Sequence, residues 1–415
     1  MTLTFRILTW GATALACALV NAQTPDRATN QMPAGESFKV LHDFEGAPLS
    51  GRPNAALVLG PDGNFYGTTS EGGVGTHCRP YGCGTIYRMK PNGTTKMLHS
   101  FDFVTDGQFP WASLLLASDG NFYGTTYYGG PRDGGTLFRM DADGNFELLY
   151  AFKRGGRKGA LPAAALVEGP DGSLYGTTVE GGTGQAPICF VNDASGCGAI
   201  FKYSRKSGVV RMLYSFTGQD GDGAFPSGPL MLAKDGNFYG TTWQGGKHQY
   251  GTLYRMTPEG EVTVLHDFDS SAGDSPSSGL VEASDGVLYG TTTGGGSGNG
   301  GTVFRITTTG DYSLVHQFDS LHEGNSPTGT LVFGPENLLY GVLRYGGDDV
   351  NCKPAGCGAA YSVSTSGTYK TLHNFNGSDG VFPSDGLVRL GEDKLLGTTE
   401  FGGSVDSGVI FTIKP

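Results

Sequence analysis

Apolar side chains along this chain occur in short runs separated by glycine-rich turns, and almost no segment shows helical periodicity. In Phe65-Tyr66, two consecutive aromatic residues occupy alternate positions of an extended segment, so they point to opposite faces of a sheet. The 71 glycines and a hydrophobic content of 38% fit the same picture. The pattern therefore predicts an all-β fold of many short strands joined by tight turns.

The eight-residue stretch DGNFYGTT occurs three times, and degenerate copies of it run along the chain. Counted from the glycine of the Tyr-Gly-Thr-Thr portion, the copies lie at Gly67, Gly124, Gly176, Gly240, Gly290, Gly341 and Gly397. Repeats of this length, with several strands each, are typical of propeller blades rather than of helical solenoids. We expect a single seven-bladed β-propeller of four-stranded blades.

Each unit contains four segments of strand-like composition. The first follows a proline such as Pro53 and is rich in Ala, Ser and Gly before an aliphatic residue such as Leu57, which suits an innermost strand crowded around an axis. The other three are exemplified by Asn64–Thr69, Gly84–Met89 and Lys96–Phe101. In DGNFYGTT, Asp-Gly supplies turn geometry, the aromatic pair interblade packing, and the threonines β-propensity. We interpret the repeat as a packing unit.

The two ends of the propeller segment are complementary. The first strand, Phe38–Phe44, has the composition of a fourth strand, whereas the chain ends with a third-type strand, Gly408–Lys414. Pairing these two strands would complete the last blade and remove an exposed edge. We expect the ring to close in this way.

The repeat resembles the GloVer tandem-repeat family, whose units have the form DGNLYGTT…GG…GTVF…LHSF. Here DGNFYGTT, GTLYRM and VLHDF carry the resemblance, which covers nearly all of the chain after the first 22 residues. Unit six departs from it with Val342-Leu343 in place of the threonine pair, and unit seven has Leu396 in place of tyrosine. The resemblance implies a surface or secreted location more than an activity.

The N-terminus has the organisation of a secretory signal peptide: a basic residue, an apolar run and a small-residue cleavage site after Ala22. We expect a signal peptide at residues 1–22, a short linker at 23–36 and the propeller at 37–415. Lipidation of Cys17 is an alternative fate of the leader. Either way, the protein is expected to be secreted, periplasmic or on the cell surface.

Six cysteines follow the leader, and they form three close pairs within loops between second and third strands: Cys78 with Cys83, Cys189 with Cys197, and Cys352 with Cys357. In an exported protein this arrangement predicts three local disulfides. Their expected role is to stiffen long loops, because closing a short loop removes little entropy from the unfolded chain. Zinc is the alternative, but it would need ligands from different blades.

Charge and missing motifs narrow the function. The net charge of −11 argues against nucleic acid or an anionic membrane as a partner. The sequence contains no phosphate loop, dinucleotide fingerprint, nucleophile elbow or zinc-protease helix. We therefore expect no cofactor, no bound metal, no membrane insertion after signal cleavage, and a monomer.

The histidines are largely part of the repeat. The same slot of the motif Leu-His-x-Phe holds His42, His99, His266, His316 and His373. Equivalent positions in so many blades cannot all be catalytic, so we interpret them as structural side chains of an edge strand with a polar tip. His77, His248 and His322 lie outside the repeat, without the spacing of metal ligands.

Function is expected on one face. In an up-down blade, the loops from second to third strands and the loops between blades emerge together, and this face holds nearly all of the variable sequence. The candidate binding residues lie there: Trp111, Trp243, Tyr128, Glu71, Glu180, Arg344 and Glu400. Trp111 follows a proline and is expected near the axis, with Trp243 farther out.

Two classes of function remain open. Exposed aromatic residues on a loop-rich face favour a binding or scaffold module for an extracellular glycan, peptide or protein. The alternative is a glycoside hydrolase or lyase that uses two carboxylates among Glu71, Glu180 and Glu400. Binding is favoured because no pair of acids stands out in the sequence, and no catalytic residue is assigned.

Overall fold

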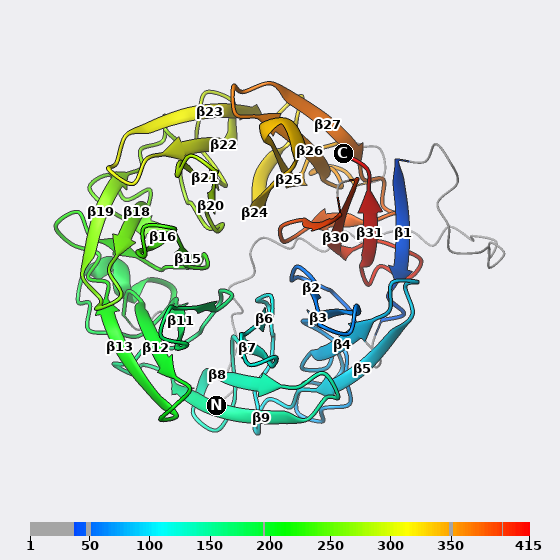
Figure 1. Ribbon diagram of the computed structural model, residues 1–415, viewed down its shortest axis with the longest axis horizontal. Coiled ribbons are helices and arrows are strands. Elements are labelled where there is room, and N and C mark those ends of the chain that lie inside the picture. The colour runs from blue at the N-terminus through cyan, green and yellow to red at the C-terminus, as the bar shows by residue number, and fades with distance from the viewer. Residues whose placement is uncertain (1–36, 47–50, 194–195, 348–351, 392) are drawn as a thin grey trace.

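Seven antiparallel sheets, one for each sequence repeat, surround a central axis in the computed structural model (Figure 1). The structure describes residues 37–46, 51–193, 196–347, 352–391 and 393–415. The predicted signal peptide and linker lie outside the described residues. The seven-bladed propeller predicted from the repeat is confirmed. No helix in the described ranges has the length and apolar character needed to cross a membrane.

Blades one to three each have four strands, which follow one another from the axis outward. Blade one is formed by β2 (Val58–Leu59), β3 (Phe65–Thr69), β4 (Thr85–Met89) and β5 (Thr95–Ser100). Blade two is formed by β6 (Leu115–Leu116), β7 (Phe122–Thr126), β8 (Asp133–Met140) and β9 (Phe146–Lys153). Blade three is formed by β10 (Val167–Glu168), β11 (Leu174–Thr178), β12 (Ala199–Ser204) and β13 (Val209–Ser215), with the 3-10 helix η1 (Pro187–Asp193) in its loop.

Blades four to six follow the same plan with local additions. Blade four comprises β15 (Met231–Leu232), β16 (Phe238–Thr242), β18 (Thr252–Met256) and β19 (Val262–Asp267), beside the small pair β14 (Gly223–Ala224) and β17 (Gln244–Gly245). Blade five comprises β20 (Val281–Glu282), β21 (Leu288–Thr292), β22 (Asn299–Ile306) and β23 (Tyr312–Asp319). Blade six comprises β24 (Asn325–Phe333), β25 (Leu338–Tyr345), β26 (Ala359–Ser364) and β27 (Tyr369–Asn374), with the 3-10 helix η2 (Pro335–Asn337).

Blade seven closes the ring with strands from both ends of the chain. Its inner strands β28 (Val381–Pro383) and β29 (Val388–Leu390) pair with β30 (Lys394–Phe401), which pairs with β31 (Val409–Ile413). The N-terminal β1 (Phe38–Asp43) then runs antiparallel to β31, and the two strands lie side by side in Figure 1. The predicted closure is confirmed, and it leaves β31 with a partner on each side.

The innermost strands differ from the prediction. In blade two, the ladder begins only at Leu115, after the aliphatic Leu114, rather than in the small-residue segment that follows Pro110. Proline has no N–H to donate, and Phe109 before it adopts a left-handed φ of 55°. In blade two, the inner segment meets the second strand at the Gln108–Tyr128 bridge and pairs again only from Leu115. Blade six has the same left-handed residue and proline, yet β24 pairs through Pro327 and Thr328, so the late start is not common to all blades.

The repeated glycine and aspartate have contacts that recur from blade to blade. A Cβ added to Gly67 would lie 2.7 Å from Cζ of Tyr87, so only glycine lets the third-strand aromatic ring cross the second strand. The Tyr66 hydroxyl donates a hydrogen bond to Asp62 at 3.0 Å, and Tyr123 donates to Asp119 at 2.7 Å. The aspartate thus accepts a hydrogen bond from the tyrosine, besides shaping the turn.

The two threonines also have separate contacts. The first of the pair donates to a carbonyl of the next inner segment, as Thr398 does to Ala55 at 3.3 Å between blades seven and one. The second pairs with a third-strand hydroxyl, as Thr69 does with Thr85 at 2.7 Å. The threonines therefore contribute directed hydrogen bonds as well as the expected β-propensity.

Aromatic side chains fill the space between blades. Tyr66 stacks on Phe122 of blade two, with ring centroids 4.1 Å apart, whereas Phe65 packs in a cluster that includes Leu396 and Ile410 of blade seven. The prediction that the two rings serve opposite neighbours is confirmed. His99 of the Leu-His-x-Phe motif stacks on the next blade, with its ring 3.8 Å from that of Phe146, so the motif histidine is a packing residue.

Candidate binding face

The inner rim of the loop-rich face is built the same way in every blade. The residue before each inner-segment proline has a left-handed φ between 55° and 59°: Arg52, Phe109, Leu161, Phe225, Ser275, Ser326 and Phe382. Such a backbone costs roughly 1–2 kcal/mol in a non-glycine residue. Backbone hydrogen bonds hold it, as between the Phe109 carbonyl and the Tyr127 N–H at 3.0 Å. Because the strain recurs in all seven blades, it belongs to the architecture rather than to one site.

Blades six, seven and one bring two arginine–carboxylate pairs to this rim. Arg52 and Glu71 approach to 2.7 Å, and Arg344 forms an ion pair with Glu400. The Arg52 guanidinium also lies 4.5 Å from the centre of the Phe401 ring. Burial raises the pKa of Glu71, Arg52 opposes this, and the negative charge of Glu400 raises it further. Glu71 and Glu400 therefore interact electrostatically across the junction of blades seven and one.

Blades two and three add an aromatic cluster. The Trp111 ring lies 4.4 Å from that of Tyr127, which in turn lies 4.5 Å from Tyr128. Burial raises the pKa of Tyr128, and the charge of the buried Glu180 raises it further, with Arg154 opposing. The structure thus places Tyr128, Glu180 and Trp111 in one neighbourhood.

Trp243 has a different environment. It is partly buried and packs against a hydrophobic cluster that includes Tyr175, Phe238 and Tyr254 of blades three and four. Packing therefore accounts for a large aromatic residue at this position.

Three residues of the rim were not identified from the sequence. Arg52 directly precedes the inner-segment proline. The residue type at this position varies from blade to blade, so its shared place on the rim becomes visible only when all seven units are compared. Tyr127 follows the threonine pair and thus occupies the same repeat position as Arg344 and Trp243. Arg154 lies in the connection between blades two and three, outside any repeat motif. Alignment of the units on the proline would have revealed the first two.

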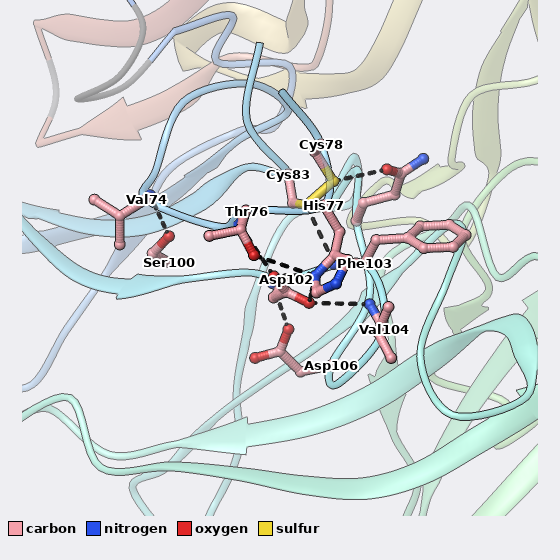
Figure 2. Close-up of polar contacts among 11 residues, drawn as sticks. Val74, Thr76, His77, Cys78, Cys83, Ser100, Asp102, Phe103, Val104 and Asp106 are labelled. Carbon is pink, nitrogen blue, oxygen red and sulfur yellow. Dashed lines mark hydrogen bonds and ion pairs between the residues drawn. A yellow bond between two sulfur atoms is a disulfide. The ribbon is translucent and has the colours of Figure 1, made fainter. Parts of the chain in front are cut away.

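A polar cluster ties together two loops of blade one on the same face (Figure 2). The Nδ1 atom of His77 lies 2.8 Å from both carboxylate oxygens of Asp102, and the N–H groups of Thr76 and Val104 donate to that carboxylate. Burial opposes ionisation of Asp102, but these hydrogen bonds outweigh it and lower its pKa. His77 is exposed and immediately precedes Cys78, whose disulfide with Cys83 closes a short loop, so the cluster stiffens this part of the chain.

The three predicted disulfides are confirmed, each within a single loop and between neighbouring cysteines. Cys78 is bonded to Cys83, Cys189 to Cys197, and Cys352 to Cys357. Disulfides persist in oxidising compartments, so they indicate a location outside the cytoplasm. In the described part of the chain, no group of three or more His, Cys, Asp or Glu side chains is arranged to hold a metal ion.

Comparison with known proteins supports the fold and the repeat. The chain is similar to the extracellular domain of a candidate hybrid two-component system from B. thetaiotaomicron, with a TM-score of 0.57, 12% identity, and coverage of 91% of this chain and 41% of that one. It is also similar to a candidate 6-phosphogluconolactonase from Bacteroides uniformis, with a TM-score of 0.50, 15% identity, and coverage of 78% and 87%. Identities this low show the fold alone.

The chain spans less than half the length of the first of these structures. A comparison with curated proteins finds no match. The family model described as the Gloeobacter/Verrucomicrobia repeat matches residues 29–190, which include blades one and two. Residues 29–190 therefore carry the Gloeobacter/Verrucomicrobia (GloVer) repeat.

Proposed function

We propose that this protein is an exported binding module that holds an extracellular ligand at the inner rim of its loop-rich face. The proposed contact surface, here called the rim arc, consists of Arg344, Glu400, Arg52, Glu71, Trp111, Tyr127, Tyr128 and Glu180. The observation that carries the proposal is their adjacency: the consecutive blades six, seven, one and two each place partly accessible charged or aromatic side chains on the rim, with the buried Glu180 of blade three beside Tyr128.

The chemistry of the rim arc favours a glycan. Guanidinium and carboxylate groups present several donors and acceptors in one plane, which suits the hydroxyl groups of a sugar. Aromatic rings offer a flat apolar surface on which a sugar ring can stack, as the Trp111–Tyr127 pair would. Side chains held in ion pairs and ring contacts also lose little additional freedom on binding, which lowers the entropic cost of association.

A glycan array tests the proposal. The wild-type protein should bind a restricted set of glycans, and Glu400→Gln with Trp111→Ala should abolish this binding. Asp143→Asn is a matched control, because it removes one carboxylate charge from an exposed turn on the opposite face. Binding that survives the rim double variant, or that Asp143→Asn weakens equally, would refute the rim as the binding surface.

The electrostatic interaction of Glu71 with Glu400 supports a second candidate function, that of a glycoside hydrolase. Retaining and inverting glycosidases pair a carboxylic acid of raised pKa with an ionised carboxylate. Glu71 has the raised pKa, and Glu400 is paired with Arg344. Catalysis would be established if the wild type released reducing sugar from a polysaccharide panel and both Glu71→Gln and Glu400→Gln lost this activity. Binding of a polysaccharide without any turnover would support the binding module instead.

A further inference from the structure

One carboxylate of the axis departs from the repeat. Asp385 lies in blade seven, two residues after Pro383 and between β28 and β29. The same position in the other six units holds a small residue: Ala55, Ala112, Ala164, Gly228, Ser278 and Gly329. Packing around the axis therefore does not call for an acid here.

Hydrogen bonds connect this carboxylate of blade seven to the inner segments of blades one and two. Its Oδ2 accepts from the Ala56 N–H at 2.8 Å and from the Ser113 hydroxyl at 2.7 Å, which belong to blades one and two. Its Oδ1 accepts from the Gly386 N–H at 2.6 Å. Blade one separates blade seven from blade two, so a side chain can connect these two blades only close to the axis, where the inner segments converge. Asp385 keeps some accessible surface there, although protein surrounds it.

Asp385 lacks a positive partner. Within the described ranges, the groups that act on its charge are Ser113, Ala56 and Gly386, all neutral donors. Burial raises the pKa of Asp385, and these hydrogen bonds only partly oppose the effect. A buried anion without a counter-charge is unfavourable, and a cationic group would relieve that cost.

The number of unused acceptor sites on the Asp385 carboxylate indicates which kind of cation it can bind. A carboxylate has about four acceptor sites, and three are filled by protein donors, so roughly one site on Oδ1 stays free. A calcium ion takes about six to eight oxygen ligands, and in the described residues no group of three or more His, Cys, Asp or Glu side chains is arranged to hold a metal ion. An ammonium group needs one strong acceptor and tolerates an apolar stem beside it.

An aromatic residue, Trp111, lies two positions before Ser113, one of the donors to Asp385. Along the inner segment of blade two, Trp111 and Ser113 are partly accessible whereas Ala112 and Leu114 are buried, so the first two face the axis. Trp111 is therefore on the same side as the hydroxyl that donates to Asp385. An alkyl chain that passes Trp111 would pack on the indole, and its cationic end would gain from the ring's negative face.

We propose that the axial end of the propeller, entered from the loop-rich face, binds an alkylammonium group, with Asp385 as its counter-charge and Trp111 against its alkyl stem. The ligand class comprises lysine side chains and aliphatic amines. The site shares Trp111 with the rim arc but uses neither Glu71 nor Glu400. Its test changes Asp385, which lies outside the rim arc, so failure of this proposal is distinguishable from failure of glycan binding.

Titration calorimetry with butylammonium chloride tests this site, with 1-butanol as the neutral probe of the same chain length. Wild type should bind butylammonium and not 1-butanol, and Asp385→Asn should lose at least about tenfold in affinity, because a charge-assisted hydrogen bond is lost. The Asn oxygen can still accept from Ser113 and Ala56, whereas the amide nitrogen cannot accept from the Gly386 N–H. Thermal unfolding of the variant, measured alongside, should therefore show only the small loss of stability expected for one hydrogen bond.

The variant Ser113→Ala distinguishes a ligand-binding role of Asp385 from a purely structural role in connecting blades seven and two. It removes one hydrogen bond across the axis but keeps the charge of Asp385, so butylammonium binding should persist. Equal binding by wild type and Asp385→Asn would overturn the proposal, as would absence of binding to wild type. Binding of calcium chloride in place of butylammonium would overturn it in favour of a metal site. If butylammonium binds, a lysine-containing peptide and free cadaverine distinguish the two natural sources of the group.

Discussion

Replacing the repeated glycine of blade two by alanine is a direct test of how the repeat packs. A Cβ at Gly124 would lie 2.5 Å from Cζ of Phe138 and 2.9 Å from Leu114. The φ of Gly124 is outside the left-handed region, so the backbone accepts an L-residue and the whole penalty is steric. Overpacking of this kind costs about 1–3 kcal/mol of unfolding free energy.

The penalty should vanish when the ring is removed. Phe138→Ala alone should cost about 3–5 kcal/mol, because it leaves a cavity beside a fully buried strand. In that background the one remaining close atom, Cδ2 of Leu114 at 2.9 Å, can shift into the cavity and give the added Cβ room. Glycine to alanine at a compatible backbone conformation then stabilises by about 0.4–1 kcal/mol through the unfolded chain. Gly124→Ala should therefore change from destabilising to neutral or stabilising.

Equilibrium urea unfolding of the four proteins in this double-mutant cycle measures the change. Gly120→Ala is the matched control, since its φ of 81° makes alanine unfavourable while no atom lies within 4 Å of the new Cβ. Its cost should be the same with and without Phe138. If Gly124→Ala lowers the unfolding free energy equally with Phe138 and with Ala at position 138, packing of the ring does not require the glycine, and the interpretation of the repeat is wrong.

Three further outcomes follow from the structure. Thr398→Val should lower the unfolding free energy by about 1 kcal/mol, since it removes the donor to Ala55 between blades seven and one; no change in urea midpoint would show that the hydroxyl is dispensable. Burial lowers the pKa of His266 despite Asp267 and Asp269, so stability should decrease as pH falls below the unfolded-state value of about 6.5. His266→Phe should weaken that dependence between pH 8 and pH 5, and an unchanged slope would contradict the assignment. Reduction with dithiothreitol should increase proteolytic cleavage within the three cystine loops and leave far-UV circular dichroism unchanged; loss of the β signal would mean that the disulfides hold the blades.

Much of the fold could be predicted because several local signals agree in each unit. The proline, the Asp-Gly turn and the Phe-Tyr pair mark the same blade positions along the chain, so register errors in one unit are corrected by the others. The closure of β1 on β31 follows from counting strand types. In blade two the innermost ladder begins later than the sequence predicts, at Leu115, whereas in blade six the inner strand includes the proline, so this boundary cannot be deduced from the proline alone.

The site was harder to predict for physical reasons. A threonine that donates to a neighbouring blade looks the same in sequence as one chosen for β-propensity, so the role of Thr398 is not visible without the structure. Arg52 is brought to Glu71 by a backbone conformation that no residue type reveals when the residue is not glycine. Asp385 occupies a slot that six other units fill with small residues, and only a comparison of register across all units singles it out.

The central claim is that the rim arc, rather than the opposite face, contacts an extracellular ligand. Hydrogen–deuterium exchange of the protein with and without a glycan identified on the array tests it most directly. The account predicts slower exchange at residues 107–111, 124–128, 342–345 and 398–401, with no change at the turns 61–63, 118–120 and 141–145. Protection confined to those turns, or to the outer strands, would contradict it.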